Sequence, residues 1–420
     1  MALELGLWVM YFVSIYFAVF WLSIIFENGV SDPVVKKKKR NLPSVTVAIP
    51  VFNEETSVVG TIESVLNLDY PSKKLQVIVV DDCSTDSTAS VVKKFIKNTN
   101  LQGIDLKYVL HEVNKGKGAA LNTALKISTG ELFICLDADS FVDSTVLKEV
   151  VPHFENGIVA SVLPLMKLQK VKGFTLGLQY VEYLVNFFMK KVMSILDCVH
   201  VTPGPFASYR KKVLVDIGGF DEDNLTEDQE IALRLQKGNY KIIQLIGPKV
   251  YTLGPETLKG WFNQRNRWYK GTLFNMKDYR KLFFNKEYGE FGMFHLPMVL
   301  GAALLSIFFS FFVIWQHMIS PLLSKLYDMS FIGFDVGLMT GVWAERFSFL
   351  DINYGLIFFT FVVMSFGLAW IIYAFKYTEE SFSTQGFFSA SLFMMIYPFF
   401  LSLVWLGVVT DLVRNKKQKW

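Results

Sequence analysis

Polar side chains follow four short apolar runs in the first third of the chain, and most of them are acidic. In chain order, these polar groups are Asn53 to Glu55, Asp81 with Asp82, Asn114 to Lys117, and Asp137 with Asp139. The last group has two carboxylates one residue apart, which suits a hard divalent cation, Mg²⁺ or Mn²⁺, that prefers oxygen ligands. Such a cation completes its shell with water and substrate phosphate. A diphosphate-bearing substrate is therefore predicted, with Lys115 or Lys117 as additional countercharge.

The apolar runs are predicted to be strands that end beside these polar groups. They are Val45–Ile49, Leu75–Val80, Leu106–Leu110 and Leu132–Leu136. Helices are expected to begin near Ser57 and Ser87, and this alternation implies an α/β fold with a mostly parallel sheet. Continuous apolar runs are typical of strands that are buried on both faces. Ligands bind such sheets at the carboxyl ends of the strands, which favours one shared site. Any one of the polar groups alone could equally be a solvated loop.

Four longer apolar segments predict helices that cross a membrane. They are Leu5–Phe26, Met293–Ile319, Ile352–Phe375 and Phe387–Thr410. The whole chain of 420 residues is 52% hydrophobic and 19% charged, which is more apolar than a soluble globular protein. About 20 apolar residues in a helix span the hydrocarbon core. Phe331–Trp343 is apolar but too short to cross, which favours an interfacial or re-entrant segment.

The first apolar segment is expected to be a retained anchor, because Met1 to Gly6 lacks the positive charge of a signal peptide. The basic run Lys36–Arg40 follows it, which places the N-terminus outside and the next residues in the cytoplasm. We therefore expect a multi-pass cell-membrane protein with a cytoplasmic sheet domain. Four crossings return the C-terminus to the outside, whereas the basic Arg414–Lys419 favours the inside. The C-terminal topology stays open.

The segments predict a division into four parts. These are an anchor with a basic linker (1–40), a cytoplasmic α/β domain (41–260), interfacial helices (261–292) and a transmembrane region (293–420). The composition argues against other classes of protein. The net charge of +4 is too balanced for a nucleic-acid partner, and three cysteines without a C-x-x-C pair favour neither a zinc site nor a disulfide framework.

With these strands and the polar groups at their ends, the segment from about Ser44 to Gly271 resembles the family 2 glycosyltransferases with the Rossmann-like GT-A fold. The resemblance implies that the stretch from Val45 to Glu54 is the opening strand and nucleotide loop, and that Asp137 and Asp139 form the D-x-D metal motif. Asp139 is then the metal ligand, with Asp137 in support. The residues implied to contact the nucleotide sugar here are Pro50, Asn53, Glu54, Lys117, Asp137 and Asp82, the last against uridine and ribose.

Two further stretches sharpen the resemblance. Leu225–Glu230 resembles the segment that supplies the catalytic base, which implies that Asp228 is the base and that Glu227 contacts the acceptor. A plain helix cap is the alternative. The stretch from Gln264 to Trp268 matches Q-x-x-R-W, which marks membrane-integrated processive members such as cellulose, chitin and hyaluronan synthases. Gln264, Arg267 and Trp268 would then contact the nucleotide sugar.

The chemistry of the Q-x-x-R-W residues fits that role. A tryptophan such as Trp268 can stack on a sugar face, of the donor or of the acceptor, and Arg267 offers a planar fork to diphosphate oxygens. A basic-aromatic interfacial helix over Trp261–Tyr279 is an alternative that is compatible with this role. Thr202–Arg210 resembles the G-P-x-x-x-Y-R stretch that lines the acceptor site in hyaluronan and chitin-oligosaccharide synthases. It implies acceptor contacts for Gly204, Pro205 and Arg210, unless the stretch is only a structural turn.

The resemblance implies an inverting, metal-dependent hexosyltransferase that extends a polysaccharide from a nucleotide sugar, foremost a UDP-sugar, with export as a coupled step. The first alternative is non-processive transfer to a lipid carrier or glycolipid. The second is a nucleotide-binding transporter or receptor, which the near absence of charge in the apolar segments disfavours. Membrane lipids surround the protein in every case. The donor sugar, nucleotide base, linkage, product length and oligomeric state stay open.

Overall fold

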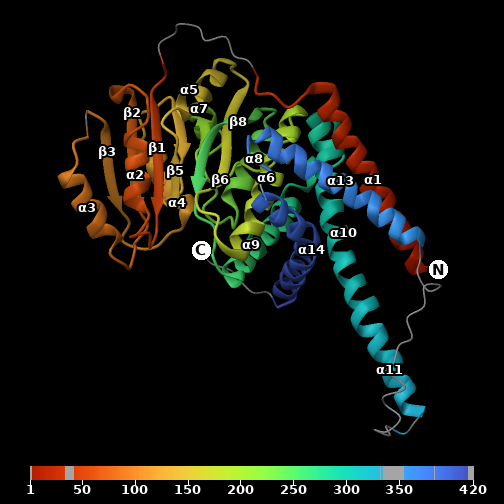
Figure 1. Ribbon diagram of the computed structural model, residues 1–420. Coiled ribbons are helices and arrows are strands. Elements are labelled where there is room, and N and C mark those ends of the chain that lie inside the picture. Colours follow the sequence, from red (N-terminus) through yellow and green to blue (C-terminus); the bar gives the residue numbers. More distant parts are fainter. Residues whose placement is uncertain are drawn as a thin grey trace.

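The computed structural model describes residues 2–33, 42–101, 103–331, 333, 354–382 and 384–414. An α/β domain lies on one side of the molecule and a group of long helices on the other (Figure 1). The basic runs at 36–40 and 415–419 and most of the apolar segment 331–343 lie outside the described residues. The predictions that depend on them stay predictions.

The α/β domain is built on a sheet of eight strands. In spatial order they are β3 (Asp105–Leu110), β2 (Leu75–Asp81), β1 (Val45–Val51), β4 (Leu132–Cys135), β7 (Ala207–Arg210), β6 (Val159–Leu168), β8 (Lys241–Thr252) and β5 (Ser140–Val142). The first four are parallel, β6 pairs with β8 in parallel, and the remaining pairs are antiparallel. The predicted α/β class and the four predicted strands are confirmed.

Helices cover both faces of the sheet because the side chains of each strand alternate between them. In β1, Val45, Val47 and Ile49 are buried in a core with the first group of helices, and Ala48 belongs to a second core with the second group. The first group comprises α2 (Val58–Leu66), α3 (Thr88–Asn98) and α5 (Val146–Val150). The second comprises α4 (Lys117–Ile127), α6 (Gly173–Ile195), α7 (Lys211–Asp216) and α8 (Glu227–Lys237).

Two longer elements join the domain to the apolar helices. The first is α6, and the second is α9 (Leu258–Asp278), which carries the Q-x-x-R-W residues. The short helical turns are η1 (Ser72–Lys74), η2 (Val151–Glu155), η3 (Arg280–Leu282) and η4 (Lys286–Tyr288), and two π-helical turns, η5 (Phe291–His295) and η6 (Trp315–Ile319), flank α10 (Leu296–Ile314).

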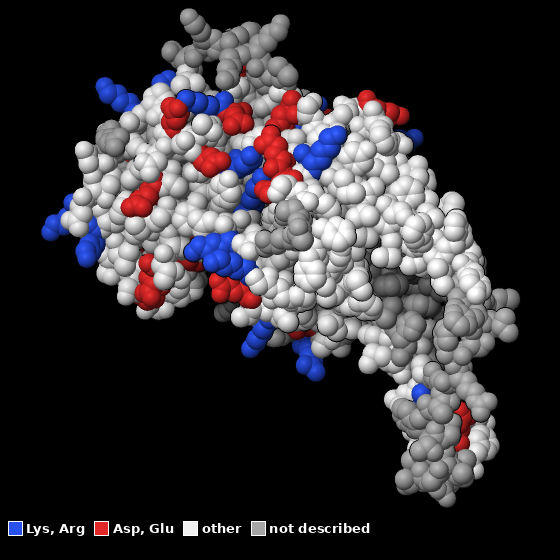
Figure 2. All heavy atoms as spheres, viewed as in Figure 1, with Lys and Arg blue, Asp and Glu red and all other residues white. Residues whose placement is uncertain are grey.

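Within the described residues, four helical segments are long and apolar enough to span a membrane. They are Tyr11–Asn28 in α1 (Ala2–Asn28), Phe291–Phe312 in η5 and α10, Ile357–Tyr377 in α13 (Tyr354–Tyr377), and Gly386–Val413 in α14 (Thr384–Val413). They match the four predicted segments. α11 (Ser320–Phe331) continues the line of α10 away from the sheet (Figure 1). Charged residues gather over the α/β domain and are scarce on the visible face of the long helices (Figure 2).

The first helix packs directly on the α/β domain. Trp21, Ile24 and Ile25 of α1 are buried in the same core as the strand residues Ile78 and Phe133. Just after α1, Asp32 binds the domain through polar contacts. Its carboxylate accepts hydrogen bonds from the Lys191 ammonium (2.7 Å) and from the backbone N–H groups of Ile246 (3.0 Å) and Gly247 (2.8 Å).

Replacing Asp32 by Ala is expected to destabilise the protein. The Lys191 side chain is 3% exposed, so the change leaves a buried ammonium without its carboxylate. Removing one partner of such a pair costs about 3 kcal/mol of unfolding free energy. The midpoint of thermal unfolding of the detergent-solubilised protein measures this effect. The matched control is Asp197→Asn, because Asp197 and Lys241 form a pair that is 49% and 43% exposed. Loss of such a surface pair costs at most about 1 kcal/mol, and equal shifts for both variants would contradict the assignment.

Candidate active site

The loops after β1 and β2 are joined by hydrogen bonds at the carboxyl edge of the sheet. Asn53 lies in the left-handed region (φ 57°), and its Oδ1 accepts a hydrogen bond from Thr85 N at 2.8 Å. Its own N–H donates to the Ser84 hydroxyl, and the N–H of Glu54 donates to the Thr88 hydroxyl at 2.9 Å. Burial raises the pKa of Glu54, and the carboxylates of Asp137 and Asp86 raise it further. Several carboxyl groups therefore lie close together at this edge.

Asp82 organises the loop that leads into α4. Its carboxylate accepts hydrogen bonds from Lys115 N (3.0 Å), from Gly116 N (2.6 Å) and from the ring of His111 (2.7 Å). The side chain is nearly buried by these contacts. Gly116 at φ 91° turns the chain so that α4 begins at Lys117. The backbone contacts of Asp82 thus position Lys117, and the predicted contact of Asp82 with uridine stays a prediction.

One cavity of about 340 Å³ lies between the sheet edge and the helices α6, α8 and α9. It brings together residues that are far apart in the sequence. The predicted site residues that line it are Lys117, Asp137, Asp139, Gly204, Pro205, Glu227, Asp228, Gln264, Arg267 and Trp268. Pro50, Asn53, Glu54 and Asp82 do not line it; they lie at the neighbouring strand ends.

Lys117 forms ion pairs inside the cavity with residues of two predicted motifs, the D-x-D motif and the Leu225–Glu230 segment. Its ammonium lies 2.7 Å from Asp137 Oδ1 and 3.1 Å from Glu227 Oε1. Burial lowers the pKa of Lys117, but Asp137 and Glu227 together raise it above its usual value, so the side chain stays a cation. The backbone of Gly204 covers this ion pair closely: a Cβ there would lie 2.5 Å from both Lys117 Nζ and Asp137 Oδ2.

Asp139 lies in the carboxylate-rich part of the cavity. Burial raises its pKa to about 7, and the neighbouring Asp137 and Glu54 add to the increase. Its Oδ1 accepts hydrogen bonds from Ser140 (3.0 Å) and Thr252 (3.4 Å). Among the described residues, no cluster of three or more His, Cys, Asp or Glu side chains is arranged to hold a metal ion. Asp137 and Asp139 still fit Mg²⁺ or Mn²⁺, because these ions need few protein carboxylates when water and phosphate complete the shell.

Manganese is therefore expected to stabilise the protein more at about pH 8 than at about pH 5.5. The pKa of Asp139 is raised in the folded state, so this carboxyl is protonated below about pH 7 and competes with the metal there. Above that pH the side chain is a buried carboxylate without a countercharge, and a bound divalent cation would supply that countercharge. The shift in the unfolding midpoint on adding Mn²⁺, measured at both pH values, checks this. Asp139→Asn should remove the pH dependence, and an equal shift at both pH values would contradict the metal assignment.

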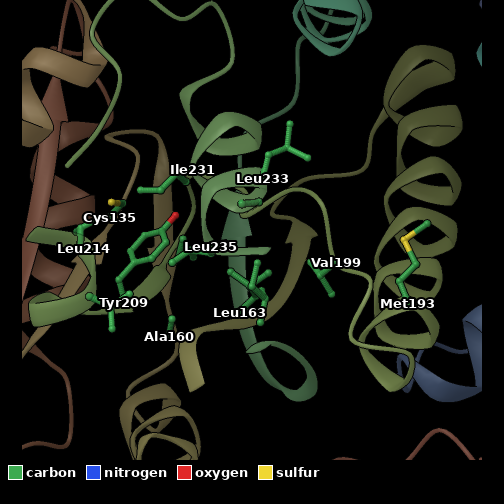
Figure 3. Close-up of a cluster of buried hydrophobic side chains, with 14 of the residues drawn as sticks. Cys135, Ala160, Leu163, Met193, Val199, Tyr209, Leu214, Ile231, Leu233 and Leu235 are labelled. Atoms are coloured by element: carbon green, nitrogen blue, oxygen red, sulfur yellow. The ribbon is translucent and has the colours of Figure 1, made fainter. Parts of the chain in front are cut away.

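Asp228 stands at the start of α8 beside the cavity. Burial raises its pKa to about 6, as does Glu227, whereas Lys117, Lys190 and Arg267 oppose the increase. It is thus a carboxylate near neutral pH and a stronger base than an exposed aspartate. α8 is held rigidly, because its Ile231 and Leu235 are buried in the core cluster that includes Tyr209 (Figure 3).

The Q-x-x-R-W residues come from α9, which lies close to the start of α8. A Cβ on Gly271 would lie 2.4 Å from the Thr226 hydroxyl, so only glycine permits this approach. Asn275 of α9 also donates a hydrogen bond to that hydroxyl at 3.0 Å. The contact keeps Arg267 and Trp268 on the cavity wall that faces Asp228.

The position of Arg210 differs from the expectation that it contacts the acceptor. β7 runs antiparallel to β4, so Arg210 pairs with Leu132 at the opposite end of β4 from Asp137. Its guanidinium donates hydrogen bonds to the carbonyl oxygens of Phe154 (2.7 Å) and Val159 (3.2 Å). Gly204 and Pro205 precede the strand and do line the cavity. Arg210 therefore supports the structure around η2 and β6.

The sequence motifs missed the contribution of α6. Glu182, Tyr183, Asn186 and Lys190 of this helix line the cavity. Lys190 lies 4.4 Å from the centre of the Phe187 ring, and burial lowers its pKa to about 8. The only available signal was the presence of charged residues within an apolar, amphipathic helix, and that pattern is common on surfaces.

Comparison with known proteins agrees with this geometry. Residues 46–218 match the description "Glycosyl transferase family 2". This part of the chain is a family 2 glycosyltransferase domain. The match contains β1 to β4 and the D-x-D residues, and it ends before Asp228 and α9. The predicted GT-A fold is confirmed, and the family match agrees with the predicted enzyme class.

Relatives of the glycosyltransferase domain include polysaccharide synthases. The poly-beta-1,6-N-acetyl-D-glucosamine synthase of Staphylococcus epidermidis is 29% identical over 269 residues, which cover 62% of this chain and 64% of the relative. The same enzyme of Staphylococcus aureus (strain COL) is 29% identical over 266 residues, or 62% and 63% of the two chains. The match thus spans less than two thirds of these relatives.

A solved structure shares the overall fold across nearly the full length. The mannosyltransferase PcManGT from Pyrobaculum calidifontis, in complex with GDP-Man and Mn²⁺, has a TM-score of 0.62 and 17% identity over 99% of each chain. At this identity the likeness concerns the fold alone. It extends over 99% of this chain, the apolar helices included, whereas the sequence relatives match 62% of it.

Proposed function

We propose that the protein is a membrane glycosyltransferase that transfers a sugar from a nucleoside diphosphate sugar to a hydroxyl of a growing polysaccharide. The observation that carries this proposal is the convergence of Asp139, Asp228 and Arg267 on one cavity, although they come from three separate parts of the chain. They supply a carboxylate for a cation, a base and a guanidinium for phosphate. The proposal also places the glycosyltransferase domain on the cytoplasmic side, where nucleotide sugars are available.

The proposed reaction is a single displacement with inversion at the anomeric carbon. Asp228 accepts the proton of the attacking hydroxyl, which its raised pKa favours. A covalent glycosyl-enzyme needs a free second carboxylate as nucleophile. Glu227 and Asp137 are engaged by the Lys117 ammonium and do not suit that role. Inversion is therefore the better-supported outcome.

The leaving diphosphate is proposed to lie between the D-x-D residues and α9. Asp139, with support from Asp137, would hold a Mg²⁺ or Mn²⁺ ion that neutralises charge on the departing nucleotide. Arg267 would donate paired hydrogen bonds to the phosphate oxygens, because a guanidinium matches their geometry. Trp268 offers a flat apolar surface for a sugar ring beside the base. Asn53, Glu54 and Asp82 would order the loops around the nucleotide.

The relatives suggest which substrates to test first. Since they are poly-beta-1,6-N-acetyl-D-glucosamine synthases, UDP-N-acetylglucosamine is the first donor and its polymer the first product. The purified protein is incubated with labelled UDP- and GDP-sugars and Mg²⁺ or Mn²⁺. Released nucleoside diphosphate and product size are measured together. A labelled polymer supports the proposal, and nucleotide binding without sugar release would overturn it in favour of a transporter or receptor.

A lipid-linked acceptor is the second candidate, and Lys190 favours it. The described residues offer this ammonium neither a hydrogen bond nor an ion pair, and its neighbours Phe187, Met189 and Met193 on the cavity wall are apolar. This ammonium interacts electrostatically with Asp228 but forms no ion pair with it, and such a cation beside apolar side chains suits the phosphate of a lipid carrier. A labelled product that extracts into organic solvent and carries one sugar would select this candidate over the polymer.

A further inference from the structure

Arg265, between the recognised residues of the Q-x-x-R-W stretch, is the buried centre of α9. Its side chain is 1% exposed, which is rare for an arginine unless it is paired. Its Nη1 donates a hydrogen bond to the Gln264 side chain, and its guanidinium lies 4.1 Å from the centre of the Trp268 ring. Both neighbours line the cavity. Arg265 therefore contacts two of the three predicted site residues of α9.

Glu182 of α6 holds this arginine by two parallel hydrogen bonds. Arg265 Nε donates to Glu182 Oε1 at 2.7 Å, and Nη2 donates to Oε2 at 2.6 Å. The Glu182 side chain is 2% exposed. A paired fork of this kind fixes the plane of the guanidinium, which a lysine at the same place would not do. The guanidinium lies over the ring of Trp268, so the position of the ring depends on the pair.

The same carboxylate also binds a transmembrane helix. The Tyr397 hydroxyl of α14 donates to Glu182 Oε1 at 2.9 Å, and Trp261 Nε1 of α9 donates to Oε2 at 3.1 Å. Trp261 in turn stacks on Phe400 of α14, with ring centres 3.8 Å apart. Glu182 thus joins α6, α9 and α14 at one buried point.

We propose that Glu182 and Arg265 form a positioning pair that orients Trp268 for the acceptor sugar and connects it to α14 through Tyr397. The inference rests on the proposed function, because it assigns a role in binding the acceptor of that reaction. Neither residue touches substrate in this role. They act by fixing Trp268, which contacts the sugar. They also connect the cavity wall to the membrane helix α14, along which a product would leave.

The test compares single and double variants of the full-length protein. Glu182→Gln and Arg265→Met should each raise the acceptor KM and lower kcat/KM for the acceptor by about 10²-fold, the effect of a displacement of about 1 Å at a site. The donor KM should change much less. The double variant should be no worse than either single variant, because the pair acts as a unit. Tyr397→Phe should shift the acceptor KM in the same direction by less, since it removes one hydrogen bond and no charge.

The matched control is Lys191→Met. Lys191 also lies on α6 and forms a buried ion pair, with Asp32, but it does not line the cavity. The Lys191→Met variant should lower the unfolding midpoint as much as Glu182→Gln does, and its acceptor KM should equal that of the wild type. Equal kinetics for the two variants, or effects of Glu182→Gln and Arg265→Met that add, would overturn the positioning pair. A wild-type protein without sugar transfer would instead overturn the proposed function.

Discussion

Replacing Asp228 by Asn is expected to abolish sugar transfer while the protein stays folded. The amide keeps the size of the side chain and the contact that its Oδ1 makes with Gln229 N at 2.8 Å, but it cannot accept a proton. Loss of a general base lowers kcat by roughly 10² to 10⁴-fold. Nucleotide-sugar binding should persist, because the D-x-D residues and α9 are unchanged. The measurements are single-turnover sugar transfer and donor binding on the same sample.

The kcat of the wild-type enzyme should depend on pH as expected for a reaction that needs Asp228 in its deprotonated form. The pKa of Asp228 is raised to about 6, so kcat should fall as the pH drops through that value and the base becomes protonated. Glu230→Gln is the matched control: this buried carboxylate lies on the same helix but is bound by Arg234 and Tyr279, away from the cavity. Its kcat should stay near wild type. Near-normal turnover of Asp228→Asn would refute the base assignment.

Replacing Gly204 by Ala is expected to lower sugar-transfer activity almost as much as Asp228→Asn does, because the added methyl group has no room. The new Cβ would lie 2.5 Å from Lys117 Nζ and 2.6 Å from Asp137 Oδ1, which is closer than any real contact. The Lys117 ammonium and the Asp137 carboxylate must therefore shift, which moves the carboxylate that supports the cation. A displacement of about 1 Å at a catalytic site costs about 10²-fold in rate. Activity and its dependence on Mn²⁺ concentration measure the effect.

Gly157→Ala is the control for this variant. No atom lies within 4 Å of a Cβ at Gly157, and the residue is exposed between η2 and β6. Its activity and stability should match the wild type. If Gly204→Ala also kept wild-type kcat and metal dependence, then Lys117 and Asp137 would not be part of the working site.

Several parts of the site could be predicted from the sequence because they depend on local pattern. Strand runs ending in Asp81, Asp137 and Asp139 are readable without coordinates, since a parallel sheet collects its strand ends at one edge. Arg210 shows the limit of this reasoning. A motif specifies which residues are neighbours along the chain, whereas the direction of β7 decides on which end of the sheet each one lies.

By itself, the sequence determined the α/β class and the apolar helices, and it named ten of the residues that line the cavity. Apolar periodicity and run length reflect burial, and burial follows from side-chain chemistry. Only the tertiary structure decided that Lys117 pairs with both Asp137 and Glu227, and that Glu182 meets Arg265 and Tyr397. These partners lie up to 215 positions apart. Their encounter depends on how whole helices pack against the sheet and against one another, and no local pattern encodes it.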